Sequence, residues 1–222
     1  MSSAPAEQVD SVRMVAAPAA GGRFLPFVYD PFLAWAERAG MGERRRRLLA
    51  QVSGDVLEVG AGTGLNLPHY PRELDRLVLA EPNRHMVKRL KRRLGSLEVP
   101  TEVIEAPAEA LPVDDSSFDA VVSTLVLCTV DDPMRALEEV RRILRPGASL
   151  FFIEHVRAEG TRLARWQDRL HRAWRGFADG CNCNRPTLNH LRDAGFTVSL
   201  EETANWRRMP PIVRPLLLGR AT

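Results

Sequence analysis

The 222-residue chain has few cysteines and no long apolar run. Its three cysteines cannot all pair, which argues against a disulfide framework and favours a reducing compartment, so we expect a cytoplasmic protein. No apolar stretch approaches the ~20 residues that a membrane-spanning helix needs. The first residues also lack the charged start and continuous apolar core of a signal peptide. These absences favour a soluble globular protein.

Aromatic residues make up only 6% of the chain, and the net charge is a modest +3. The arginines are bunched, most visibly at 44–47 and within 88–94. Basic grooves that bind nucleic acid usually interleave aromatic residues or carry a recognition module, and neither is present, so we expect no nucleic-acid partner. Solvated helix faces explain the clusters best, with weak peripheral contact to anionic lipid surfaces left open.

The chain divides into a tail and one domain. Residues 1–22 are rich in Ala, Pro, Ser and Gly without apolar periodicity, which is typical of a disordered tail. Residues 23–222 are predicted to form a single domain: helices or a lid at 23–52, an α/β core at 53–156, and further helices with the last two strands at 157–222. The pattern carries no prediction of the oligomeric state.

From about residue 53, short apolar runs alternate with helical patterns. This alternation is typical of a mostly parallel sheet with helices on both faces. Each apolar run is aliphatic or β-branched and has the length of a strand. The predicted strands are 55–59, 76–81, 101–106, 118–124 and 149–156, with two more near 196–202 and 214–220.

The intervening segments carry helix signatures. A first helix is expected directly after the first strand, and Asp132 followed by Pro133 predicts the start of a later one. At 161–177 the apolar residues fall on one wide stripe, which predicts a helix packed on the sheet with Trp166 in the core. The stripe consists of Leu163, Trp166, Leu170, Ala173, Trp174 and Phe177.

The glycine-rich turn "LEVGAGTGLN" at 57–66 joins the first strand to the next segment. A dinucleotide fingerprint would need its third glycine at position 65, which is Leu65, and no lysine follows as in a triphosphate loop. The second strand ends in Glu81, whose carboxylate can accept hydrogen bonds from two ribose hydroxyls. The pattern predicts an adenosine ligand without a pyrophosphate.

The motifs "LEVGAGTG", "LAEPN", "APAEALPVDDSSFDAVVSTLVL" and "ALEEVRRILRPGASLFFIEHV" resemble, in order, those of class I S-adenosylmethionine-dependent methyltransferases. The resemblance implies a Rossmann-like fold with seven strands and S-adenosyl-L-methionine as cofactor. Pro107 departs from the family pattern, which often has an acidic residue there to contact the adenine. The resemblance assigns the methionine part to Glu58, Gly60, Ala61, Gly62, Gly64, Thr124 and Leu125, the ribose to Glu81, and the adenine to Pro82, Asn83, Ala108 and Glu109. Asn66 is expected to bind the cofactor as well.

The second half, with "TLVLCTV", "EHV", "DGCN" and a closing "W…VRP", is similar to bacterial relatives of the methyltransferase-like thiol S-methyltransferases. This similarity implies a small-molecule acceptor, with a thiol favoured. The alternatives are N- or O-methylation of a phospholipid headgroup, quinone or secondary metabolite, and a non-catalytic module that only binds the cofactor.

The acceptor side offers several candidates. His155 follows the fifth strand and is expected to deprotonate or orient the acceptor, or else to be a satisfied histidine in the wall, while Asp179 is a weaker catalytic candidate. The segment "FADGCNCNRP" lacks zinc-site spacing, so we expect no metal and interpret it as a loop over the acceptor pocket or a plain surface turn. The expected substrate residues are Trp174, Phe177, Cys181 and Trp206.

Overall fold

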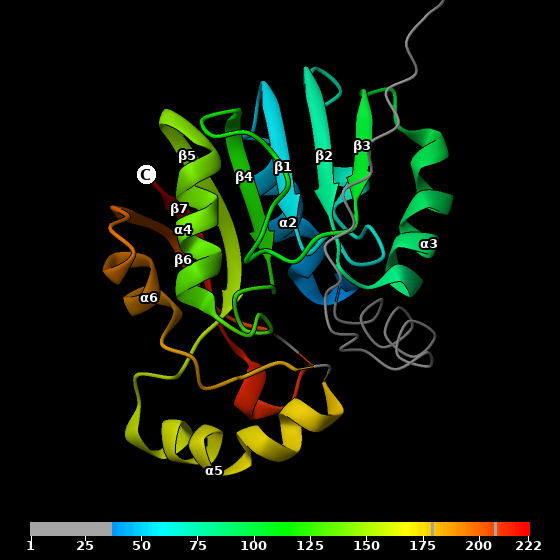
Figure 1. The fold of residues 1–222 in the computed structure, drawn as a ribbon. Coiled ribbons are helices and arrows are strands. Elements are labelled where there is room, and N and C mark those ends of the chain that lie inside the picture. The colour runs from blue at the N-terminus through cyan, green and yellow to red at the C-terminus, as the bar shows by residue number, and fades with distance from the viewer. Residues whose placement is uncertain (1–36, 179, 207) are drawn as a thin grey trace, which may run out of the picture.

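The computed structural model describes residues 37–222 apart from 179 and 207 (Figure 1). The predicted tail at 1–22 and the start of the predicted N-terminal helices therefore lie outside the described residues. Among those described, no helix is both long and apolar enough to cross a membrane.

A seven-stranded sheet in the order β3-β2-β1-β4-β5-β7-β6 forms the centre of the fold. The first five strands are parallel, and β7 runs antiparallel to both β5 and β6, which confirms the predicted mostly parallel sheet. The strands are β1 (Asp55–Val59), β2 (Arg76–Ala80), β3 (Thr101–Ile104), β4 (Phe118–Thr124), β5 (Leu144–His155), β6 (Val198–Asn205) and β7 (Pro215–Ala221).

Strand β5 begins five residues before the predicted position 149. Leu144 already pairs with Phe118, and the register then shifts so that Ser149 pairs with Ala120. The Arg-Pro-Gly segment at 145–147 lies in this irregularity, where proline loses no ladder hydrogen bond.

Helices cover both faces of the sheet, and each face has its own core. One core joins Leu48 of α2 and Leu90 of α3 to the sheet, and the other joins Leu137 of α4 and Leu191 of α6. Residues Asn83 and Asp132 cap α3 and α4 through side-chain oxygens that accept backbone N–H groups, the second as predicted. The helices are α2 (Gly42–Leu49), α3 (Arg84–Arg93), α4 (Pro133–Ile143), α5 (Thr161–Phe177) and α6 (Thr187–Asp193), and the short helical turns are η1 (Glu37–Met41), η2 (Leu67–His69), η3 (Leu94–Ser96) and η4 (Pro211–Val213).

The helix expected directly after the glycine turn is absent from this described segment. In its place, η2 spans only Leu67–His69 before the chain turns into β2. Pro68 and Pro71 account for the difference, because proline disfavours helical backbone in the residue before it and cannot donate an intrahelical hydrogen bond.

The prediction that Trp166 lies in the core is wrong. Helix α5 exposes 56% of Trp166 and 70% of Phe177, whereas Ala164 and Gln167 are buried. The amide of Gln167 donates to the carbonyls of Val156 and Ile212, so its polar bonds turn that side of the helix toward the body.

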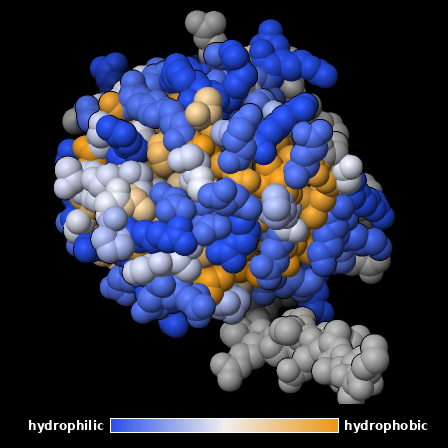
Figure 2. All heavy atoms as spheres, turned by 90° about the horizontal axis from the view of Figure 1, so that it is seen from above, coloured by the Kyte–Doolittle hydropathy of each residue, from blue (hydrophilic) through white to orange (hydrophobic). Residues whose placement is uncertain are grey.

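The parallel strands run downward in Figure 1, so their carboxyl ends and α5 lie at the bottom. Figure 2 looks at the opposite edge from above, where hydrophilic side chains surround an area of apolar ones. Ligands of open parallel sheets bind at the carboxyl edge, which places the predicted site residues at the bottom of Figure 1.

Candidate functional site

The three glycines of the turn after β1 have distinct roles. All have positive φ: 60° at Gly60, 58° at Gly62 and 84° at Gly64. A Cβ atom at Gly60 would lie 2.5 Å from Val126 Cγ2, and one at Gly64 would lie 2.7 Å from Leu67 Cδ1. At Gly62 the nearest atom would be the Gly60 carbonyl oxygen at 3.9 Å. Packing therefore requires Gly60 and Gly64, whereas Gly62 borders open space into which a ligand fits.

The Glu81 carboxylate lies against this turn, as the sequence predicts. One oxygen accepts a hydrogen bond from the Gly62 N–H at 2.8 Å, and the other accepts from the Asn83 N–H at 2.9 Å. Asn83 also has a buried Nδ2 without a hydrogen-bond partner. A fixed carboxylate, an open glycine and an unpartnered donor suit the hydroxyls and ring nitrogens of a nucleoside, so these residues fit the implied cofactor.

A buried hydrogen-bond network supports the turn from beneath. Glu58 on β1 accepts from Asn66 Nδ2 at 2.8 Å and from the Tyr70 hydroxyl at 2.8 Å. Asn66 Nδ2 also donates to Thr124 Oγ1 at 3.1 Å, which joins the loop after β1 to the last residue of β4. Burial raises the pKa of Glu58 to about 7, although its two hydrogen bonds act in the opposite direction.

Arg45 ties the N-terminal helix α2 to this network. Its Nη1 donates to Asn66 Oδ1 at 2.6 Å, and its guanidinium forms an ion pair with Glu37 at 3.1 Å. Only 4% of Arg45 is exposed. The sequence did not indicate this role, because Arg45 belongs to a run of four consecutive arginines and nothing in the run distinguishes the buried side of the helix from its exposed side.

The residues expected at the adenine edge lie in the loop after β3. Ala108 is buried, and Glu109 accepts hydrogen bonds from the backbone N–H of Asp131 at 2.9 Å and of Asp132 at 3.3 Å. Pro82 is exposed beside Glu81. The Glu109 side chain thus braces the start of α4, a contact that its position in the motif did not reveal.

The chain makes a strained bend where β4 ends, at the residues expected to face the methionine moiety. Leu125 has φ of 60°, a left-handed conformation that costs a residue with a side chain about 1–2 kcal/mol. Its N–H donates to Ile153 O at 2.8 Å. One oxygen of buried Glu154 accepts from the N–H groups of Val126 and Leu127, which offsets the strain.

The cysteine-containing loop docks on the segment after β4. The sulfur atoms of Cys181 and Cys128 lie 3.6 Å apart, and the Asn182 N–H donates to Cys128 O at 2.7 Å. The hydrogen bond between the Cys181 and Cys128 thiols raises the pKa of Cys128 and lowers that of Cys181. Arg185 Nη1 donates to Leu127 O at 2.6 Å from the same loop. All three cysteines are free, and no metal-binding cluster of His, Cys, Asp or Glu occurs within the described part of the chain.

The aromatic candidates on the acceptor side form two pairs, His155 with Trp206 and Trp174 with Phe177. His155 is buried with its ring centroid 5.2 Å from that of Trp206, and burial lowers the pKa of His155 to about 4. Trp174 and Phe177 lie 5.7 Å apart on α5, with Trp174 half-buried. Asp179 lies outside the described residues.

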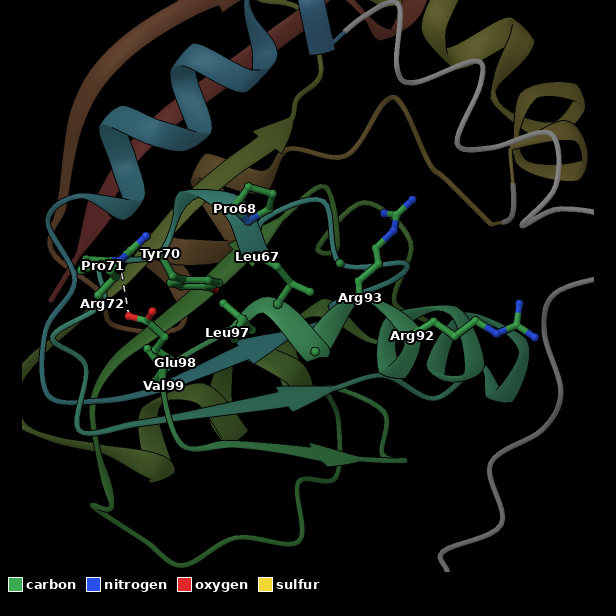
Figure 3. A pocket seen from close by; sticks show the side chains of 12 residues that line it. Leu67, Pro68, Tyr70, Pro71, Arg72, Arg92, Arg93, Leu97, Glu98 and Val99 are labelled. Atoms are coloured by element: carbon green, nitrogen blue, oxygen red, sulfur yellow. Dashed lines mark hydrogen bonds and ion pairs between the residues drawn. The ribbon is translucent and has the colours of Figure 1, made fainter.

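A hollow of about 640 Å³ opens beside η2 and η3 (Figure 3). Of the predicted site residues only Gly64 lines it, so it is not the cofactor site. Arg93, on its rim, donates from Nη1 to Thr63 O at 2.9 Å and thereby braces the glycine turn from outside.

Comparisons with known proteins agree with this geometry. A family model described as a methyltransferase domain matches residues 57–152. The chain is 35% identical to human thiol S-methyltransferase TMT1B, covering 82% of this chain and 79% of that protein. It is 32% identical to phosphatidylethanolamine N-methyltransferase of Cereibacter sphaeroides, covering 58% of this chain and 65% of that protein.

The fold is also similar to that of solved structures. The crystal structure of an S-adenosylmethionine-dependent methyltransferase from Thermotoga maritima matches with a TM-score of 0.64 and 22% identity, covering 90% of this chain and 97% of that one. The motif order, the bend at Gly62 with Glu81 beside it, and the extent of the sequence match lead to one conclusion. The chain belongs to the class I S-adenosylmethionine-dependent methyltransferases, enzymes that use S-adenosyl-L-methionine as methyl donor.

Proposed function

We propose that the enzyme transfers the methyl group to a small thiol. S-Adenosylmethionine supplies an electrophilic methyl on a sulfonium sulfur, and a nucleophile behind that methyl displaces it in line. The observation that carries the proposal is the 35% identity with a thiol S-methyltransferase over 82% of this chain.

The protonation states at the carboxyl edge support an acidic acceptor. His155 is a weak base, because burial lowers its pKa to about 4. Burial raises the pKa of Glu154 to about 7, and its Oε2 has no hydrogen-bond partner. A thiol with a pKa near ~8.5 is already a few per cent thiolate at neutral pH and needs little help from a base. An amine or alcohol acceptor would need more help from a general base to lose its proton.

For the reaction, we assign His155 the task of orienting the acceptor, with Asp179 as a second candidate. The unpartnered Nδ1 of His155 supports this role, because a buried polar atom without a partner suits a ligand. We assign the acceptor pocket to Trp174, Phe177, Cys181 and Trp206, with the cofactor held by the glycine turn and Glu81. The same free cysteines support a cytoplasmic location.

A panel of alkyl thiols, phenols and amines with cofactor labelled in the methyl group tests the proposal. Label should enter the thiols, with a rate that rises with pH as the thiolate fraction increases. Methylation of phenols or amines without methylation of thiols would refute thiol specificity while leaving the methyltransferase activity intact.

A second candidate is N-methylation of a phospholipid headgroup, favoured by the 32% identity with phosphatidylethanolamine N-methyltransferase. The shorter coverage of 58% of this chain makes it the weaker candidate. Phosphatidylethanolamine vesicles in the same assay distinguish the two, because only this second candidate predicts labelled lipid.

A further inference from the structure

Helix α5 carries an apolar face that the described part of the chain, residues 37–222 without 179 and 207, leaves exposed. Hydrogen bonds fix its rotation about its axis. Gln167 is fully buried, and the two N–H groups of its Nε2 lie within hydrogen-bond distance of three carbonyl oxygens, those of Val156 at 3.1 Å, Cys183 at 2.8 Å and Ile212 at 2.9 Å. Its Oε1 accepts from the Ala158 N–H at 2.7 Å. The other side of the helix is thereby held away from the protein body.

The outward side presents large apolar residues in a line. Trp166 is 56% exposed, Leu170 38% and Phe177 70%. With Ala173 between them, they are spaced by four, three and four positions, so they follow one flank of the helix. Eleven residues at 1.5 Å each give this row a length of about 16 Å. Exposed apolar rows of this kind mark interaction surfaces.

The charge of the same helix is strongly positive. Helix α5 contains five arginines and one acidic residue, Asp168. That aspartate already pairs with Arg157 at 2.8 Å. The arginines exposed on the solvent side of the apolar row are Arg162, Arg165, Arg169 and Arg172, whereas Arg175 forms an ion pair with Asp131 at 3.6 Å. A partner that covers this helix must therefore offer both negative charge and an apolar layer.

The helix also lies where a flat partner can reach it. Figure 1 shows α5 below the sheet at the outer end of the molecule, roughly across the strand direction. Trp, Leu and Phe on one flank with arginine on the next is the composition of helices that lie in the interface of a membrane. Indole rings prefer the headgroup level, and guanidinium groups pair with lipid phosphates.

We propose that α5 is an interfacial helix that docks the enzyme on anionic phospholipid surfaces. Trp166 and Leu170 enter the headgroup–acyl boundary, and the arginines bind lipid phosphates. Because α5 lies at the carboxyl edge of the sheet, docking would bring the acceptor side of the enzyme close to the lipid. This inference does not depend on whether the acceptor is a thiol.

Sedimentation of the full-length protein with vesicles tests the proposal. Vesicles of phosphatidylcholine alone are compared with vesicles that also contain phosphatidylglycerol. We expect at least about tenfold tighter binding to the anionic vesicles, and a loss of that preference at high salt. Equal binding to both vesicles, or no binding to either, would overturn the proposal.

Matched variants locate the contact. The double variant Trp166→Ser/Leu170→Ser should lose at least about tenfold in vesicle affinity, because the membrane would no longer bury the two side chains. Leu200→Ser removes an apolar residue that is 42% exposed on β6 and should bind as the wild type does. All three substitutions are at exposed positions, so melting temperatures near that of the wild type check that each variant is folded.

The charge contribution has its own control. Arg162→Gln/Arg169→Gln/Arg172→Gln should weaken binding to anionic vesicles more than Lys88→Gln/Lys91→Gln/Arg92→Gln, which removes the same charge from the exposed side of α3. Equal losses from both triple variants would show unspecific attraction and refute a docking role for α5.

Two other occupants of the row are outcomes of the same experiments. If a second copy covers it, analytical ultracentrifugation will show a dimer that Trp166→Ser/Leu170→Ser dissociates. If another part of the chain covers the row, acrylamide will fail to quench the fluorescence of Trp166, which is identified as the signal that the variant Trp166→Phe lacks. Either result contradicts membrane docking.

Discussion

Replacing Gly62 with alanine should separate cofactor binding from folding. An alanine at φ of 58° costs about 1–2 kcal/mol, because its Cβ approaches the backbone carbonyl. The new side chain would not clash with other residues, since its Cβ would lie 3.9 Å from the nearest atom, the Gly60 carbonyl oxygen. The methyl group would instead enter the open space next to Glu81. We therefore expect Gly62→Ala to fold, with a small loss of stability, and to bind the cofactor at least about tenfold more weakly, which corresponds to 1.4 kcal/mol or more.

Gly60→Ala is the matched control. It has the same left-handed conformation, at φ of 60°, and therefore a similar backbone cost. Its Cβ would also lie 2.5 Å from Val126 Cγ2, and such overpacking adds about 1–3 kcal/mol. Urea unfolding without ligand and calorimetric titration with S-adenosylhomocysteine measure the two effects. Wild-type affinity in Gly62→Ala, or equal destabilisation of both variants, would refute the reasoning.

Three further predictions concern the buried polar groups. The pKa of Glu58 is about 7 in the folded protein against 4.5 normally, so its contribution to stability falls as pH rises from 4.5 to about 7, and Glu58→Gln should flatten that part of a urea-unfolding pH profile. His155→Ala should lower the turnover rate. The pH profile of the rate should keep the shape of the wild-type profile near pH 6.5, because the pKa of His155 is about 4 and this residue does not titrate there; an unchanged rate at neutral pH would exclude the residue from the mechanism. Arg45→Gln should destabilise the protein by ~3 kcal/mol, since it breaks a buried ion pair, whereas Arg46→Gln, at an exposed pair, should leave the unfolding midpoint unchanged; similar midpoints for both would contradict the network.

The sheet and the position of Glu81 beside the glycine turn could be predicted because local rules and the fold agree there. The strand runs are rich in Val, Leu and Ile, which is typical of buried parallel strands, and Asp132 with Pro133 is a strong helix start. The glycine spacing excluded a dinucleotide loop, and Glu81 lies beside the turn because β1 and β2 are neighbours in the sheet. These features depend on residues close in sequence or on neighbouring strands.

The orientation of α5 and the burial of Arg45 could not be predicted, because both depend on long-range contacts that the periodicity of the sequence does not indicate. In α5 the apolar stripe is wider than the surface available to cover it, and the buried amide of Gln167, with its bonds to separate carbonyls, decides which flank is covered. Arg45 is buried although its arginine neighbours lie at the surface, because Asn66 and Glu37 satisfy it. Both are polar groups whose partners lie elsewhere in the chain, so composition gives no indication of them.

Calorimetric titration of the wild type and Glu81→Gln with S-adenosylhomocysteine tests the central claim most directly. The wild type should bind with release of heat. Glu81→Gln should bind about tenfold or more weakly, since hydrogen bonds to a charged group are worth about 1.5–3 kcal/mol. Glu102→Gln, at an exposed position on β3, should match the wild type. No heat with the wild type, or full affinity in Glu81→Gln, would contradict a nucleoside held between the glycine turn and this carboxylate.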